Sequence, residues 1–320
     1  MSAVNRSDVE SSTFLLTGIP GLDHGLELFS FPLCVLYVMS FVGNYTILFV
    51  IKKEPHLHTP MCLLLFLLAI TDLGLSLSTM PTVLSIFCFN SRVISPNACF
   101  SQLFFIHAFT IMESSVLLAM AFDRFIAICN PLRYASILTG PVIVKIGFAI
   151  LIRSVSLRIP APILLKRLRY CGVIELSHAF CIHPELIKLS CSNATVNSIY
   201  GLFVVLSTMG IDSLFIVLSY VMIIKTVFRI ASQEEQLKVL GSCVCHICAV
   251  LLFYTPPLGL SMILRFHNKK DPSITTLLAY IHFLLPPVMN PIVYSVKTKE
   301  IRKAILKMLG QNRILSRRLA

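Results

Sequence analysis

Acidic side chains within long apolar stretches are the residues of this sequence most able to carry chemistry. Asp72 and Glu113 each lie within such a stretch, and Asp212 lies in a third. Two carboxylates in an apolar medium must be neutralised by protons or by a cation. The pair could therefore share a cation, or at least one acid could be protonated and hydrogen bonded, and both alternatives stay open. For Asp212 we expect a hydrogen bond to a neighbouring helix.

A basic side chain at the end of an apolar stretch is a candidate for binding an anion. Arg265 lies about 28 Å from His246 along a helix, at 1.5 Å per residue, and so at the far end of its stretch. Ser261 and Met262 lie one turn deeper on the same face. Because a guanidinium can hold a carboxylate through two hydrogen bonds, we expect Arg265 to contact a ligand rather than to reach outer water or pair with Asp271.

A short run of cysteines with one histidine, Cys243-Val244-Cys245-His246-Ile247-Cys248, has the residue types of a metal site. On a helix, however, only Cys245 and Cys248 share a face. Since a structural zinc site needs four convergent ligands, small residues packing between helices are the better interpretation. The sequence also has no nucleophile–base pair at a suitable spacing, so we do not expect an enzyme.

The stretches that hold these residues are long enough to span a membrane. Hydrophobic residues make up 56% of the chain and charged residues 13%, whereas soluble domains average about 45–50% and about 25%. A membrane-spanning helix needs roughly 20 mostly apolar residues, and continuous apolar runs favour helices over a barrel. The sequence predicts an all-α membrane protein, a single-domain bundle of seven transmembrane helices. The spans lie near 28–51, 59–87, 97–122, 141–164, 196–224, 239–264 and 272–296.

The distribution of Lys and Arg predicts the orientation of the bundle. Most of them fall in segments that lie inside if the tail, residues 1–25, is extracellular. That tail has no apolar core of a signal peptide. Residues 297–320 form a cytoplasmic tail that begins with an amphipathic eighth helix on the inner leaflet. We expect a multi-pass plasma-membrane protein whose net charge of +12 reflects contact with anionic lipids and not with nucleic acid.

Four cysteines and one glycosylation motif are expected on the outer side. One cysteine begins the third span, and three lie in the long link 165–195. The cysteines are Cys99, Cys171, Cys181 and Cys191. Extracellular cysteines favour disulfides, and four cysteines allow three pairings. Asn5-Arg6-Ser7 is a candidate glycosylation site at Asn5.

Six short motifs lie in order along the seven spans. They are Gly43-Asn44, Leu57-His58-Thr59-Pro60-Met61, Met120–Cys129, Ser219-Tyr220, Lys238–His246 and Pro287–Tyr294. Together they resemble the odorant-receptor family of rhodopsin-like G-protein-coupled receptors over the whole chain. Gly18–Leu22 and Phe105–Ala108 resemble its fish-like class I branch, whose members often detect carboxylic acids. Cys62, Phe125 and Cys245 depart from the family's motifs.

The resemblance implies a switch at the inner side of the bundle. Its residues are Asp123, Arg124, Tyr220, His246, Asn290, Pro291 and Tyr294. Contacts of Arg124 with Tyr220 and His246 are expected to rearrange when the sixth span moves outward, and Pro291 kinks the seventh span. The resemblance also implies a sodium ion shared by Asp72 and Glu113. It further implies the disulfides Cys99–Cys181 and Cys171–Cys191.

A ligand cavity is expected beneath the link 165–195. His107, Ile111 and Ser114 lie along one face of the third span, and the resemblance implies that His107 lines the cavity, with a packing histidine as the alternative. His183 would lie above the cavity. Arg158 could turn inward and add a second cation to the cavity, but at its depth we expect it to point outward to the headgroups. The apolar walls are expected to come from Ala161, Val205 and Leu258.

The resemblance implies an odorant receptor that binds a small volatile ligand in a pocket on the extracellular side, with carboxylic acids as one candidate ligand class. Its partners would be the odorant, membrane lipids and a heterotrimeric G protein of the stimulatory olfactory type, which raises cyclic AMP. No cofactor is expected beyond the sodium ion. One alternative is a transporter or channel that uses the intramembrane acids, although inverted repeats and paired broken helices are not evident. A non-olfactory chemosensory receptor of the same fold is another.

Overall fold

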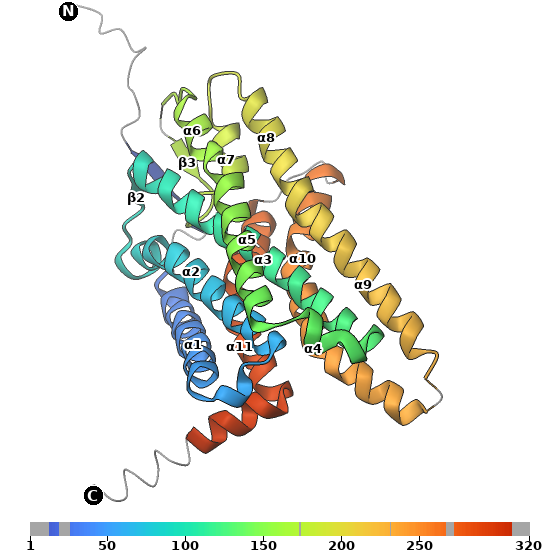
Figure 1. The fold of residues 1–320 in the computed structure, drawn as a ribbon. Coiled ribbons are helices and arrows are strands. Elements are labelled where there is room, and N and C mark those ends of the chain that lie inside the picture. Colours follow the sequence, from blue (N-terminus) through green and yellow to red (C-terminus); the bar gives the residue numbers. More distant parts are fainter. Residues whose placement is uncertain (1–12, 19–25, 173, 231, 267–271, 309–320) are drawn as a thin grey trace, which may run out of the picture.

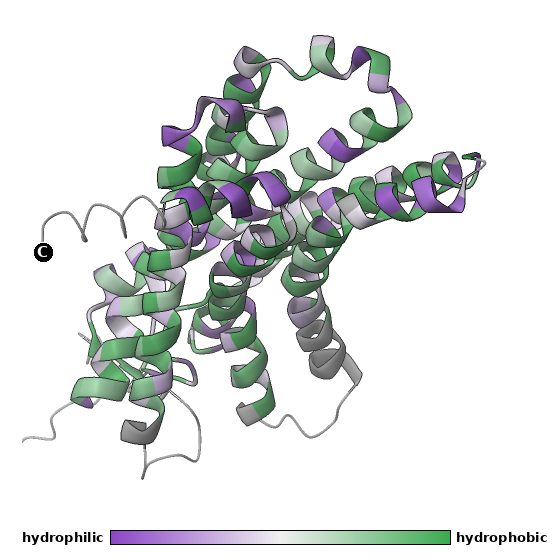
Figure 2. Ribbon diagram, turned by 90° about the horizontal axis from the view of Figure 1, so that it is seen from below, coloured by the Kyte–Doolittle hydropathy of each residue, from purple (hydrophilic) through white to green (hydrophobic). Residues whose placement is uncertain are grey.

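The computed structural model describes residues 13–18, 26–172, 174–230, 232–266 and 272–308, without the side chains of 26–28, 242, 259–266, 272–273 and 297. Within these residues, five helices are long and apolar enough to cross a membrane, and two bent helix pairs raise the number to seven when each pair counts as one span. The ribbon is apolar along most of its helices (Figure 2). The predicted seven-helix membrane bundle is confirmed.

The spans follow one another in chain order and form a bundle (Figure 1). They are α1 (Leu26–Lys53), α2 (Pro60–Phe89), α3 (Pro96–Cys129), α5 with α6 (Gly140–Arg158 and Pro160–Lys166), α8 with the π-helical turn η3 and α9 (Thr195–Val205, Leu206–Gly210 and Ile211–Val227), α10 (Gln233–Phe266) and α11 (Pro272–Lys297). The shorter elements are η1 (Pro55–Leu57), η2 (Pro131–Arg133), α4 (Tyr134–Ile137), α7 (His183–Lys188) and a final helix over 299–308.

Local sequence signals explain where α2 and α3 begin and end. Thr59 caps α2 by accepting a hydrogen bond from the Cys62 backbone N–H, and Ser95 caps α3 in the same way. A proline follows each cap, at the first helical position, where its missing N–H costs nothing. Asn90 ends α2 in the left-handed conformation, which asparagine tolerates better than most residues.

A three-stranded sheet covers one end of the bundle, and its central strand comes from the amino-terminal segment. Strand β1 (Phe14–Leu16) pairs antiparallel with β2 (Val93–Ile94) and parallel with β3 (Ile174–Leu176). Phe14 is buried against the rings of Phe100 and Tyr170. The described part of the predicted extracellular tail is therefore docked on the bundle, at the end that we call the lid end (Figure 1).

The opposite end, which we call the tail end, carries the helix over 299–308. Ile301 and Ala304 are buried there, and Ile305 and Met308 pack against the same hydrophobic cluster. Lys307 Nζ donates to Glu54 Oε1 over 3.1 Å, which joins the helix to the end of α1. The predicted amphipathic eighth helix is thus present, with its apolar face turned to the bundle.

Candidate functional site

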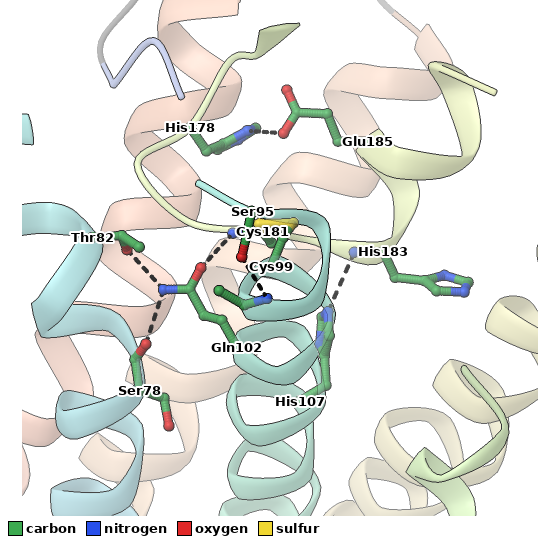
Figure 3. Close-up of a disulfide and its surroundings, with 11 residues drawn as sticks. Ser78, Thr82, Ser95, Cys99, Gln102, His107, His178, Cys181, His183 and Glu185 are labelled. Atoms are coloured by element: carbon green, nitrogen blue, oxygen red, sulfur yellow. Dashed lines mark hydrogen bonds and ion pairs between the residues drawn. A yellow bond between two sulfur atoms is a disulfide. The ribbon is translucent and has the colours of Figure 1, made fainter. Parts of the chain in front are cut away.

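The segment between α6 and α8, residues 167–172 and 174–194, forms a lid over the bundle. Two disulfides fix it: Cys99–Cys181 joins it to the first turns of α3, and Cys171–Cys191 closes it internally. These are the two pairs that the resemblance implies. Figure 3 shows the first of them beside the polar contacts that hold the lid in place.

Gln102 and His107 extend the attachment of the lid along α3. The Gln102 amide donates to Ser78 O (2.9 Å) and Thr82 Oγ1 (2.7 Å), and its oxygen accepts from the Cys181 backbone N–H (3.0 Å) (Figure 3). One turn deeper, His107 Nε2 accepts a long hydrogen bond, 3.5 Å, from the His183 backbone N–H. Because Nε2 accepts, a neutral His107 ring carries its proton on Nδ1.

A second polar contact closes the lid upon itself. His178 Nδ1 and Glu185 Oε2 lie 2.8 Å apart, and the other carboxylate oxygen of Glu185 accepts from the Ser177 backbone N–H. Thr276 on α11 donates to the Ser177 carbonyl (3.2 Å). The lid therefore contacts both α3 and α11, so a movement of the lid would alter contacts with both spans.

Arg158 lies beneath the lid, although the sequence predicts that it points outward. It is the last residue of α5 and only 5% exposed. Its buried Nε has no hydrogen-bond partner, and no carboxylate of the described residues pairs with it. The expectation that Arg158 reaches the headgroups is wrong, because Pro160 starts the separate helix α6 and the lid packs over this end of the span. An unpaired buried guanidinium is a strong site for an anion.

His183 is a lid residue whose electrostatics this cation affects. Its side chain is buried, and its Nε2 has no partner. It packs on α8 so closely that a Cβ added at Gly201 would lie 2.8 Å from His183 Cε1. Burial, and next the positive charge of Arg158, lower the pKa of His183 from 6.5 to about 4. A neutral imidazole and a guanidinium therefore face the same region with open hydrogen-bonding capacity.

Ser114 takes part in a polar network deeper in the bundle. Its Oγ donates to Asp212 Oδ2 and contacts Tyr254 Oη, both at 2.8 Å. Arg153 on α5 holds the same carboxylate through two hydrogen bonds of 2.9 and 3.0 Å. The expected hydrogen bond from Asp212 to a neighbouring helix is confirmed. Arg153, its main partner, was not predicted. A cation in the middle of an apolar stretch nevertheless indicates a paired or functional residue.

The apolar residues expected around the ligand differ in exposure. Ile111 is buried on α3, and Ala161 is buried on α6. Val205 and Leu258, by contrast, are 48% and 62% exposed, whereas Val204, next to Val205, is buried. The part of Val205 and Leu258 in walling the cavity stays a prediction.

Four residues named from the sequence cannot be assigned contacts. Asn5 lies outside the described residues, as do the side chains of Ser261, Met262 and Arg265. The backbone of the last three belongs to the final turns of α10. Their part in ligand binding stays a prediction.

The two carboxylates expected near the membrane centre do meet. The Asn290 amide nitrogen donates to both oxygens of Asp72 (3.3 and 3.2 Å) and to Glu113 Oε1 (3.4 Å), and all three side chains are buried. Carboxylate oxygens are the ligand type that hard cations prefer, so the donor set fits a sodium ion. Among the described residues, no group of three or more His, Cys, Asp or Glu could hold a metal ion, the cysteine run of α10 included.

The switch residues at the tail end are arranged in two separate pairs. Arg124 donates to Asp123 Oδ2 from Nη2 (2.6 Å) and Nε (3.0 Å). Tyr220 Oη lies 2.7 Å from His246 Nδ1, and His246 Nε2 lies 2.9 Å from the Leu117 carbonyl. Since a carbonyl only accepts, Nε2 carries the proton and Nδ1 accepts from Tyr220. Tyr220 and His246 thus bond to each other and not to Arg124, whose carboxylate partner Asp123 also accepts from Tyr134 Oη (2.8 Å).

Close packing explains the motifs of the first and last spans. A Cβ added at Gly43 would lie 2.8 Å from Pro291 Cγ, so only glycine lets α1 approach α11 at this point. Asn44 donates to the Pro287 carbonyl (2.8 Å), which Pro291 leaves without its helical N–H partner. Tyr294 is fully buried, with Oη 4.0 Å from Met120 Sδ on α3.

Comparisons with known proteins agree with this architecture. The model of a family described as "Olfactory receptor" matches residues 33–312. The chain is 57% identical to human Olfactory receptor 51G2 over 94% of this chain and 96% of the relative. It is 54% identical to human Olfactory receptor 51L1, over 94% and 96%, and 53% identical to human Olfactory receptor 51A7, over 97% and 98%.

These relatives are named as receptors and not as enzymes, transporters or channels, and each aligns over nearly its whole length. The apolar spans, the two disulfides and the motifs of α3 and α11 described above lie within the matched region or beside it. The chain therefore belongs to the olfactory receptor family of seven-helix G-protein-coupled receptors.

Proposed function

We propose that this receptor binds a small volatile carboxylic acid beneath the lid and responds by activating a G protein of the stimulatory olfactory type, which raises cyclic AMP. The observation that carries the proposal is Arg158, a buried cation without a counter-ion in the described part of the chain. A charge held out of water needs a partner. A ligand carboxylate would supply it through two parallel hydrogen bonds.

His183 gives the proposed ligand a second polar contact. Its free Nε2 and the guanidinium of Arg158 come from the lid and from α5, and both belong to buried side chains. The binding of an anion between them would offset the positive charge that disfavours protonation of His183. The pKa of His183 would then rise, and the imidazole could donate to the ligand. Arg265 stays a candidate for a further contact from α10.

The route from the ligand to the inner side would run through α3. His183 contacts His107 on α3, and the same helix carries Asp123 and Arg124 near its other end. A ligand that favours one of two arrangements of the bundle shifts their populations by its difference in affinity. We infer that the active arrangement exchanges the Asp123 partner of Arg124 for contacts with Tyr220 and His246 and opens the tail end to the G protein.

The position of the disulfides supports the orientation that this function needs. Both disulfides involve the lid, and disulfides persist on the oxidising side of a membrane. Strand β1 pairs with β3 of the same lid. We therefore infer a plasma-membrane receptor with its amino terminus outside and the helix over 299–308 at the inner leaflet. For Asp72 and Glu113 we propose a shared sodium ion, which would stabilise the unliganded arrangement.

A cyclic AMP assay in cells that express the receptor tests the proposal. The ligands are straight-chain fatty acids, with the matched alcohols and methyl ketones as neutral controls. Arg158→Gln should raise the half-maximal acid concentration about 10- to 100-fold, because hydrogen bonds to charged groups contribute about 1.5–3 kcal/mol, and Arg158→Lys should lose less. Arg167→Gln changes an exposed lid arginine and is the matched control.

Surface labelling of each variant separates loss of binding from loss of expression. Unchanged acid responses in Arg158→Gln at equal surface levels would refute the anchor. Responses that persist in cells without stimulatory G proteins would refute the coupling. Replacing external sodium by N-methylglucamine should raise the basal signal, and no change would argue against the sodium ion.

A further inference from the structure

A cavity of about 430 Å³ lies between α3, α5 and α9, away from the lid and its histidines. Its volume falls within the range of about 300–1,000 Å³ that is typical of small-molecule sites. It is lined along α5 by Ile146, Ala149 and Arg153, along α3 by Ser115 and Phe122, and along α9 by Phe215. The ligand proposed above does not use this cavity.

The cavity opens toward the bilayer. Phe122 and Phe215 are 42% and 51% exposed although both belong to membrane spans, so their rings face lipid at the rim. Most of the other lining residues are apolar. Ser115 and Phe122 are two turns apart on α3, about 10 Å along the axis. A molecule dissolved in the membrane could therefore enter from the side, without passing the lid.

Arg153 gives the cavity one polar end. A guanidinium has five N–H donors. Nη1 uses two on Ser115 Oγ (2.7 Å) and Asp212 Oδ2 (3.0 Å), and Nη2 uses two on Ser207 O (2.9 Å) and Asp212 Oδ1 (2.9 Å). The Nε–H has no acceptor within the described part of the chain, while the side chain lines the cavity and keeps 29% exposure. One hydrogen-bond donor is left for an occupant.

The charge balance at this end determines the kind of occupant. Asp212 pairs with Arg153 through both carboxylate oxygens and is almost fully buried. The pair is neutral as a whole, so an anion would meet the carboxylate as well as the guanidinium. A neutral acceptor oxygen can take the free Nε–H without adding charge to the membrane interior. The remainder of the molecule must be apolar to match the walls.

We propose that this cavity is a second, membrane-facing binding site for a neutral lipophilic molecule with one acceptor oxygen, such as a long-chain ketone, ester or alcohol. The site is distinct from the acid site beneath the lid and does not depend on it. An occupant would contact α3, α5 and α9 together. Ser219 lines the cavity, and the next residue, Tyr220, holds His246 of α10. An occupant would therefore lie one residue from this contact.

Photolabelling of the purified full-length receptor in lipid nanodiscs tests the proposal. The probe is dodecan-2-one with a diazirine in its chain, and the labelled residues are mapped by peptide mass spectrometry. Labels should fall on α5 around Ile146–Arg153 and on α9 near Phe215. Ala149→Phe fills the cavity and should reduce labelling at least about fivefold. Val144→Phe, at a 57% exposed position of the same helix outside the lining, should leave labelling unchanged.

Competition on the unmutated receptor keeps the test independent of how the variants fold. Unlabelled dodecan-2-one should compete about fivefold more strongly than dodecane, the value expected for one net hydrogen bond. Equal competition by dodecane, or equal labelling of the two variants, would overturn the site as non-specific lipid contact. Stronger competition by dodecanoate would overturn the neutral class in favour of an anion. Loss of acid responses in Arg158→Gln with intact photolabelling would show that the two sites are separate.

Discussion

The ion pair between Arg153 and Asp212 joins α5 to α9 inside the membrane, and removing either partner should destabilise the receptor more than removing both. Asp212 is 2% exposed, and Arg153→Met would leave it with Ser114 as its remaining donor among the contacts described. Breaking a buried pair on one side costs about 3–5 kcal/mol, whereas replacing both partners by apolar residues is often nearly neutral. We expect the lower end, about 3 kcal/mol, because Arg153 keeps partial exposure.

Thermal unfolding of the purified receptor in one detergent measures the difference. At roughly 2–4 °C per kcal/mol for large chains, Arg153→Met and Asp212→Leu should each lower the Tm by roughly 6–12 °C. The double variant should recover to within roughly 4 °C of the unmutated receptor. A double variant that is as unstable as the sum of the two single variants would show instead that the two side chains act independently.

Three further predictions concern the lid end. Gly201→Ala places a methyl group 2.8 Å from His183 Cε1, so His183 must shift, and acid potency in the cyclic AMP assay should fall about fivefold, the equivalent of one hydrogen bond. The pKa of His183 is lowered from 6.5 to about 4 in the folded state, so the unfolded chain binds more protons in this interval. The free energy of unfolding should therefore fall as pH decreases from 6.5 toward 4, and His183→Asn should flatten that dependence of the Tm. Phe14→Ala should cost about 3 kcal/mol and speed proteolysis within β1, whereas Val93→Ala, at an exposed position of β2, should do neither.

Local signals made most of the fold predictable. Apolar length identified the spans, and the Thr59-Pro60 and Ser95-Pro96 pairs fix the starts of α2 and α3 within the chain itself. Strand β1 was not predictable in this way. Three residues of the tail become a strand only because segments near Ile94 and Ile174 pair with them. These partners are distant in the sequence, so the tail itself carries no pattern that predicts the pairing.

The site residues divide along the same line. The contact between Asp72, Glu113 and Asn290 follows from burial of acids in neighbouring spans, which a sequence displays. The position of Arg158 near the end of a span predicts contact with the headgroups. The packing of the lid, α6 and α8 instead buries it. Arg153 and Asp212 are 59 residues apart. Each is visible in the sequence alone, but their pairing depends on how α5 and α9 both pack on α3.

If Arg158 holds the carboxylate of a ligand beneath the lid, an experimental structure of the receptor with an activating fatty acid should show it. Carboxylate oxygens should lie about 2.7–2.9 Å from the Arg158 guanidinium nitrogens, with His183 beside them. An acid bound elsewhere in the bundle, with Arg158 turned to the lipid headgroups, would exclude Arg158 as the anchor.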